Sequence, residues 1–518
     1  YILYIEQGTP FHPDLKLSKK EFGCDPIDYY KRINVFLTKI ETQTKLEVII
    51  SLPPKTELFM PELTNFFLDR QIFINRTAEL TKDCEFVLAQ YSTAISCALI
   101  YKKPVILFSL LPFFLITGPF LSDLSISIIS LLFLIYCLKE KNFSYFKNKY
   151  FYFFLIFWGY LLINSLINNF NLGSLKISFF YFRYGVFVIA ISSLLEVDKK
   201  FIKYFFYCIF LCFTILIIDG FFQYFMGENI LGWKNTNTSR LSSFFGDELI
   251  LGSYLSRLWP IFFGLSLFYF KKKDKLFFVF ILVFILSEVL IFLSGERTAF
   301  FYINLSAIFV ILFSSKLLKL RLITLLSSLL IIIIITYFNP TAKQRIIDKT
   351  IGQLNIVDVY GKINLADMQD GIYIFSRQHT HHYISGYRMF LDNKVLGVGV
   401  KNFRNFCGNQ KYRKSKLSCS THPHNTYVQI LSETGIIGFL FLMFVFFYFC
   451  KYALKHLLSK LKGKQYFTDF EICVLSGILI YLWPFVPTGN VFNNWLNITI
   501  ILYLPFLIWS RKLIKTQN

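Results

Sequence analysis

The sequence predicts an all-α protein that crosses a membrane many times and is preceded by a partial α/β segment. Its 518 residues are 55% hydrophobic and include 63 Phe. Apolar runs of roughly 17–25 residues recur along the chain, and this is the length that an α-helix needs to cross a bilayer. A soluble protein of this size would show amphipathic periods in place of continuous apolar runs.

Residues 1–103 lack these long apolar runs and read as a soluble segment. Three short apolar runs predict strands: Lys45–Leu52, Glu85–Ala89 and Pro104–Phe108. Helical patterns lie between them, at about Asp28–Glu41 and Thr93–Tyr101. This alternation indicates part of an α/β layer. Because the segment is too short for a doubly wound domain and the chain begins at Tyr1 without Met, we expect a fragment, with no signal peptide before the first span.

Residues 104–518 carry the apolar runs, which predict about twelve membrane-spanning helices. Their expected positions are 105–120, 123–138, 150–168, 176–195, 201–222, 250–269, 276–293, 299–315, 320–338, 428–450, 470–486 and 495–510. An even number of spans puts both termini on one side of the membrane. If that side is the cytoplasm, the basic clusters in short links, for example Lys316, Lys319 and Arg321, also lie there, as the positive-inside rule requires.

The net charge of +22 does not indicate a nucleic-acid-binding protein, because the basic residues lie in those short links. The polar segment 339–425 is the longest expected outer loop, and loops of this length are usually functional or disordered. It holds five of the seven histidines: His379, His381, His382, His422 and His424. It also holds Cys407 and Cys419, which can form a disulfide in an oxidising compartment, with two free thiols as the alternative.

Several arginines lie where a charge is costly or where a span ends. Arg183 lies inside an apolar run, and Arg297 lies in a polar break between two expected spans. Arg240 and Arg388 lie in the expected outer loops. Guanidinium groups bind phosphate oxygens in bidentate fashion, so such a set indicates a site for a diphosphate. The structural alternatives are pairing of Arg183 with a carboxylate such as Asp219, neutralisation of Arg297 by Glu296, and solvation of the loop arginines.

His424 and Asn425 lie where the polar segment meets the apolar run that follows. His titrates near neutrality, so His424 is a candidate general base for an attacking hydroxyl, and an interfacial capping residue is the alternative. We expect His379, His381 and His382 to be surface or packing residues, because their spacing fits no usual zinc pattern. The expected outer loops carry no Asp-X-Asp pair, so a reaction without a metal or other cofactor is the simpler interpretation.

The membrane part, about 104–518, resembles the O-antigen ligase and O-antigen polymerase superfamily of bacterial envelope glycosyltransferases. The ligase signature is His, then Asn, Ser or Gln, nine residues, Gly, two residues, then Gly, Thr or Tyr. It is matched here by His424-Asn425, the nine residues Thr426–Thr434, Gly435 and Gly438. Further similar segments are Ser294–Thr298, Arg240 with Phe244–Gly246, Gly397–Gly399 with Asn402-Phe403, and Trp483–Phe485 with Pro487–Gly489 and Asn493–Trp495.

The resemblance implies about twelve helices in the bacterial inner membrane, a large periplasmic loop and cytoplasmic termini. It further implies transfer of a glycan from undecaprenyl diphosphate to a hydroxyl of lipid A–core without a metal. His424 falls on the family's proposed base, and Arg297 matches an arginine thought to contact the diphosphate. Arg183 and Arg240 are weaker correspondences. His424 and Arg297 are thus the expected catalytic residues, and Arg183, Arg240, Arg388 and Asn425 form the expected substrate-binding set.

The N-terminal segment has a separate resemblance, to the C-terminal end of a glycosyltransferase-B-like surface-carbohydrate biosynthesis protein. It rests on Phe11–Asp14, Tyr29-Tyr30, Val48–Ile50, Tyr91–Ala94 and Lys102–Pro104. We expect this piece to be inactive, since the usual first half is missing. Pro104–Phe108 would serve both as its last strand and as the start of the first span, which hints at a fusion of neighbouring reading frames.

Three alternatives to a ligase remain open from the sequence. A polymerase of the same fold would transfer the growing chain to another lipid-linked repeat, and a protein O-glycosyltransferase would use Ser or Thr. A transporter of a lipid-linked anion would also suit many spans and buried arginines. It would, however, often show an internal repeat and broken helices near the midplane. No internal repeat is visible in this sequence.

Overall fold

The computed structural model is mostly helical. It describes residues 1–6, 25–53, 61–89, 107–168, 170–197, 200–234, 240–269, 275–315, 318–338, 343–348 and 376–517. The chain divides into two compact units: residues 1–108 with 128–143, and residues 109–127 with 144–518.

The first unit contains a parallel four-stranded sheet in the order β3–β2–β1–β4. Its strands are β1 (Ile2–Ile5), β2 (Val48–Leu52), β3 (Ile72–Ile74) and β4 (Phe86–Ala89), and its helices are α2 (Pro26–Thr44), η2 (Pro61–Phe66) and α4 (Thr77–Asp83). The strands expected within 45–52 and 85–89 are confirmed, whereas β1 and β3 were not expected. Residues 104–106 of the third expected strand and the expected helix at 93–101 lie outside the described residues.

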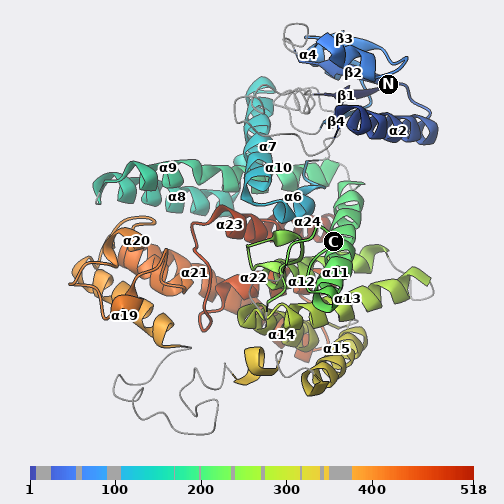
Figure 1. Cartoon of the computed structure of the whole chain (residues 1–518). Helices are drawn as coiled ribbons and strands as arrows, with labels where there is room; N and C mark the ends of the chain where they lie inside the picture. The colour runs from blue at the N-terminus through green and yellow to red at the C-terminus, as the bar shows by residue number, and fades with distance from the viewer. Residues whose placement is uncertain are drawn as a thin grey trace. The chain divides into compact units, whose positions relative to one another are not determined.

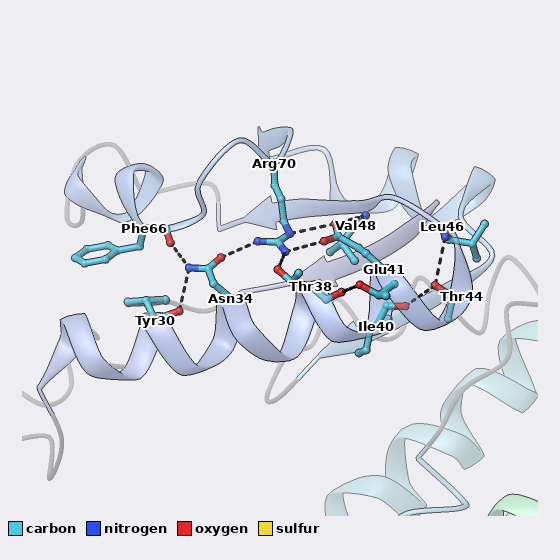
Figure 2. Close-up of polar contacts among 11 residues, drawn as sticks. Tyr30, Asn34, Thr38, Ile40, Glu41, Thr44, Leu46, Val48, Phe66 and Arg70 are labelled. Carbon is cyan, nitrogen blue, oxygen red and sulfur yellow. Dashed lines mark hydrogen bonds and ion pairs between the residues drawn. The ribbon is translucent and has the colours of Figure 1, made fainter.

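Helix α2 is tied to the segment after η2 by one arginine (Figure 2). The guanidinium of Arg70 donates to both carboxylate oxygens of Glu41 and to Asn34 Oδ1, at 2.7–3.2 Å. The Asn34 amide in turn donates to the Phe66 carbonyl, at 2.5 Å. These contacts fix the segment over one face of α2. The motif residues of the N-terminal resemblance at 11–14, 91–94 and 102–104 lie outside the described residues, so that resemblance stays a prediction.

The second unit is built from helices that follow the expected apolar runs (Figure 1). Its helices, with α7 shared between the two units, are α6 (Leu111–Ile116), α7 (Pro119–Lys139), α8 (Lys149–Ile167), α9 (Leu172–Phe180), α10 (Phe182–Val197), α11 (Lys200–Met226), α12 (Leu251–Tyr269), α13 (Lys275–Leu293), α14 (Arg297–Phe313), α15 (Leu318–Phe338), α19 (Arg377–Asp392), α20 (Phe403–Phe406), α21 (Thr426–Leu461), α22 (Asp469–Leu482), α23 (Asn494–Ile501) and α24 (Tyr503–Gln517).

Within the described ranges, six helical segments are long and apolar enough to cross a membrane: 119–139, 149–167, 172–196, 201–226, 318–338 and 426–461. The chain is therefore a mostly helical, multi-pass membrane protein, while the number of about twelve spans stays a prediction. Helices α12, α14 and α22 pack against one another and form the centre of the second unit.

Arg321, one of the basic residues expected at a cytoplasmic link, lies in the first turn of α15 and is fully buried. Its side of the membrane stays a prediction. Its guanidinium pairs with the buried Glu288 carboxylate and lies over the Trp259 ring, 4.3 Å from the centroid. A buried arginine is tolerated among apolar helices when its charge is paired in this way. Arg321 is therefore a packing element of α13 and α15.

Candidate functional site

The N-terminus of α21 holds the two residues that open the signature. Asn425 caps the helix, because its side-chain oxygen accepts hydrogen bonds from the amides of Tyr427 and Val428, at 2.9 and 3.1 Å. Its amide nitrogen donates to the Pro484 carbonyl, at 2.9 Å. His424 precedes the cap with a φ of +56°. The Asn425 side-chain amide thus forms hydrogen bonds within the protein, and contact of Asn425 with a substrate stays a prediction.

Three imidazole rings surround the ring of His424 in the described segment 376–425. The ring centroids lie 4.1, 5.2 and 5.5 Å from that of His424, for His422, His382 and His379 respectively. His379 and His382 are three residues apart on α19, so they share one face of that helix. Helix α19 packs against α21, as the orange ribbons of Figure 1 show. We call His379, His382, His422 and His424 the histidine cluster.

Burial and mutual repulsion keep the histidine cluster uncharged at neutral pH. Burial lowers the pKa of His424 below its usual value. Burial and the His424 charge lower the pKa of His379 and of His382 to about 4. The same two causes lower the pKa of His422 to about 3. An uncharged His424 can accept a proton, and its Nε2 lies 3.0 Å from the Ser420 hydroxyl.

The α19 histidines were expected to be surface or packing residues, and the structure shows that they pack. The rings of His379 and His382 contact that of His424, whereas His381 faces Ser415, with 2.6 Å between Nδ1 and the hydroxyl oxygen. In the residues that the structure describes, no group of three or more His, Cys, Asp or Glu side chains has an arrangement that could hold a metal ion. Protonation of His424 would disfavour protonation of its neighbours, as the lowered pKa values of His379, His382 and His422 indicate.

Arg297 begins α14 and is near the histidine cluster, since its charge contributes to the lowered pKa of His379. The neighbouring Glu296 turns toward α12. Its carboxylate accepts hydrogen bonds from the Gly252 amide at 2.7 Å and from the Ser253 amide and hydroxyl at 3.1 and 2.7 Å. These amides belong to the first turn of α12, where a carboxylate is favoured by the helix dipole. Glu296 thus anchors the start of α12 beside Arg297.

The other expected arginines lie in different surroundings. Arg240 donates to the Leu249 carbonyl at 2.7 Å, and its charge interacts with the Glu296 carboxylate. Arg183 pairs with Asp123 at 2.5 Å, and not with Asp219, which accepts from the Ile230 amide and the Ser243 hydroxyl. Arg388 donates to the Arg413 carbonyl at 2.9 Å. Of the four expected arginines, Arg297 and Arg240 thus share one neighbourhood, which surrounds Glu296.

Sequence reasoning missed Arg257, although the criterion applied to Arg183 also fits it. Arg257 lies in α12, one turn beyond Ser253, and is 4% exposed. Its guanidinium carbon lies 4.7 Å from the Tyr302 ring centroid and 5.0 Å from that of Tyr481. Its Nε and Nη1 atoms have no hydrogen-bond acceptor within the described ranges. Its position inside an apolar run was the sequence signal that could have identified Arg257.

The structure explains why the signature has a glycine at position 435. It lies inside α21 with a φ of +63°, and a Cβ atom there would collide with the Val395 carbonyl oxygen. The segment before α20 passes over this kink, where the Val398 amide donates to the Ser432 carbonyl at 2.9 Å. The buried Glu433 carboxylate accepts from the amides of Lys401 and Phe403, at 3.1 and 3.0 Å. The kink therefore fixes the segment that carries Lys401 and Arg404.

A disulfide joins Cys407 to Cys419, with 4.9 Å between their Cα atoms. It connects the end of α20 to the segment that leads into His422 and His424. Arg404 precedes Cys407 by three residues, and His422 follows Cys419 by three. The charge of Arg404 also contributes to the low pKa of His422. Arg404, and not Arg388, is thus the loop arginine that lies close to the histidine cluster.

Comparison with known proteins gives one family match. No curated protein matches the chain. A family model described as O-antigen ligase matches residues 278–443, which include α14, the histidine cluster and the Gly435 kink. This matched part of the multi-pass helical chain is therefore similar to the O-antigen ligase family.

Proposed function

We propose that this chain is an inner-membrane glycan ligase that transfers a glycan from undecaprenyl diphosphate to a hydroxyl of lipid A–core. The family match indicates a glycosyltransferase of the O-antigen ligase or polymerase type. The donor, the acceptor, the periplasmic position of the site and the absence of a metal are parts of the proposal. The observation that carries it is the uncharged, half-buried His424, grouped with other imidazoles near the cation Arg297.

In the proposed reaction, His424 accepts the proton of the acceptor hydroxyl. The freed oxygen attacks the anomeric carbon of the donor sugar and forms the new glycosidic bond. The bond between that carbon and the diphosphate breaks, and its electron pair leaves with the lipid diphosphate. Cations near the site stabilise the charge that develops on the leaving group. A base whose pKa is lowered by burial is already unprotonated at neutral pH and is ready for this step.

Arg297, Arg240 and Arg257 are the proposed cations for the diphosphate. The ends of α12 and α14 bring them together, because Glu296 links the two helix starts and interacts with the charge of Arg240. Arg257 follows one turn into α12, with Nε and Nη1 available for an oxygen acceptor. We assign Arg183 a supporting role, because Asp123 already neutralises it. Arg388 and Asn425 remain proposed acceptor contacts.

The test of the proposal is a transfer assay with purified protein in nanodiscs. The donor is an undecaprenyl-diphosphate-linked glycan and the acceptor is lipid A–core. His424→Ala is expected to lower the transfer rate about 100-fold or more, since general base catalysis contributes at least this factor. His456→Gln is the control, because His456 lies near the far end of α21 and its Nε2 donates to the Phe313 carbonyl. Transfer at the wild-type rate by His424→Ala would refute the base assignment.

The same assay separates the ligase from the polymerase. Lipid A–core that gains glycan supports the ligase. A ladder of longer lipid-linked glycans formed without lipid A–core would replace the proposal with polymerase activity. Transfer that persists after dialysis against a chelator supports the metal-independent mechanism.

A further inference from the structure

Two cations that lie near the buried Glu433 carboxylate have no role in the diphosphate site. Lys401 is half-buried and Arg404 is exposed, and they lie three residues apart at the start of α20. In the part of the chain that the structure describes, neither side chain forms a hydrogen bond or an ion pair with a neighbour. By contrast, Lys411 on the same loop pairs with Asp392 at 2.6 Å.

The backbone that presents these two cations is held by many contacts. Lys401 has a φ of +57°, which is uncommon for a residue with a side chain. The buried Glu433 carboxylate holds the amides on either side of Asn402. The side-chain oxygen of Asn402 accepts from Asn405 at 2.8 Å and from Ser174 at 3.3 Å. An unfavourable backbone conformation that neighbouring groups enforce is typical of functional sites.

The nearest buried carboxylate does not pair with either cation. Both oxygens of Glu433 accept hydrogen bonds from backbone amides, and one also accepts from the Gln429 amide at 3.0 Å. Glu433 thus sets the shape of the segment and only partly balances its charge. Burial, and then the like charge of Arg404, lower the pKa of Lys401, against the opposing effect of Glu433. A bound anion would relieve this repulsion.

Arg297 and Arg404 each interact with a different ring of the histidine cluster. The charge of Arg297 acts on His379, and that of Arg404 acts on His422. The ring of His424 contacts both of these rings, with centroids 5.5 and 4.1 Å away. Arg297, at the start of α14, and Arg404, in the polar segment, thus each interact with a ring that contacts His424. A ligase needs its base between the donor diphosphate and the acceptor.

We propose that Lys401 and Arg404 bind an anionic group, a phosphate or a sugar carboxylate, carried by the acceptor glycan. This inference rests on the proposed function and adds the chemistry by which the acceptor is recognised. Arg404 supplies a planar fork for two oxygens, and Lys401 supplies a point charge beside it. The bound anion holds the acceptor against α20, so that a neighbouring hydroxyl can face His424.

The kinetic test uses Lys401→Gln, Arg404→Gln and the double variant, with Lys411→Gln as the matched control. Lipid A–core with its sugar phosphates intact is compared with the same material after phosphatase treatment. The double variant is expected to raise the acceptor KM about 10-fold or more, because charge-assisted hydrogen bonds are lost. The donor KM stays unchanged, and Lys411→Gln behaves as wild type. If the recognised anion is a phosphate, phosphatase treatment removes the difference between the double variant and wild type, and if it is a sugar carboxylate, the difference persists.

A rise in donor KM, or an unchanged acceptor KM in the double variant, would overturn the inference. A binding measurement without donor keeps it separate from the proposed function. Acceptor binding to protein in nanodiscs is measured by native mass spectrometry, with intact lipid A–core, its dephosphorylated form and inorganic phosphate as probes. Weaker binding of intact acceptor by the double variant supports the site even if the wild-type protein transfers no glycan. Equal binding of intact acceptor by both proteins contradicts it, as does an effect seen with inorganic phosphate alone.

Discussion

The rings of His382 and His424 are stacked, with centroids 5.2 Å apart and planes inclined by 23°. His382 belongs to α19 and is fully buried, whereas His424 directly precedes the cap of α21. Two rings at this distance cannot both carry a proton without strong repulsion. The protonation of one histidine therefore depends on the state of the other.

The histidine cluster predicts a loss of stability on mild acidification. The folded pKa values of His382 and His422, about 4 and about 3, lie below the unfolded value of about 6.5. The unfolded chain thus binds more protons below pH 6.5, and stability falls as the pH falls from there toward 4. The slope is up to ~1.4 kcal/mol per pH unit for each histidine. The check is the thermal midpoint of the detergent-solubilised protein from pH 7.5 to 4.5, and His422→Asn should flatten its pH dependence. An equally steep dependence in that variant would contradict the assignment.

Gly435→Ala is expected to prevent correct folding of the segment between α19 and α21, residues 393–425. The residue needs a positive φ, which costs about 1–3 kcal/mol for a non-glycine residue, and its Cβ would also collide with the Val395 carbonyl oxygen. Gly408→Ala is the matched control, since no atom lies within 4 Å of a Cβ at Gly408. Monodisperse yield and thermal midpoint measure the effect. Equal behaviour of both variants would show that the α21 kink tolerates a side chain.

Loss of the Cys407–Cys419 disulfide is expected to destabilise the segment between α19 and α21. A loop closed over 12 residues corresponds to about 3 kcal/mol of chain entropy in the unfolded state. Cys407→Ser and Cys419→Ser should each lower the thermal midpoint, and a reducing agent should lower that of the wild type but not those of the variants. Cys450→Ser removes a free cysteine and should keep the wild-type response to reduction. An unchanged midpoint for reduced wild type would contradict this expectation.

Arg257→Met separates a packing role from an anion-binding role. Methionine fills a similar volume without a buried charge, so stability should be equal to wild type or higher. If Arg257 binds the diphosphate, the donor KM should rise about 10-fold or more, because charge-assisted hydrogen bonds to it are lost. The acceptor KM should not change. A lower thermal midpoint with an unchanged donor KM would show that the two tyrosine rings hold Arg257 as a structural cation.

Local sequence signals predicted the helices well where the apolar runs are long. The expected spans at 276–293 and 299–315, for example, correspond to α13 and α14. Asn425 follows the preference for N-cap residues whose side chain accepts from the next amides. Short elements were not predicted. Strand β3, for example, has only 3 residues, too few to show the alternation of apolar and polar residues that predicts a strand. The surroundings of Arg257 could not be predicted, because the rings of Tyr302 and Tyr481 that lie against it belong to helices far along the chain.

The sequence by itself determined the class of the protein and the positions of most apolar helices. It also placed His424 at a polar-to-apolar boundary. Those properties depend on neighbouring residues, which a linear pattern records. Only the tertiary structure decided which groups surround His424. His382 reaches it because α19 packs against α21, and Arg404 comes close to His422 because a disulfide and the Gly435 kink direct its segment there. Such contacts join residues far apart in the chain, so packing and chain path select them, and residue spacing does not.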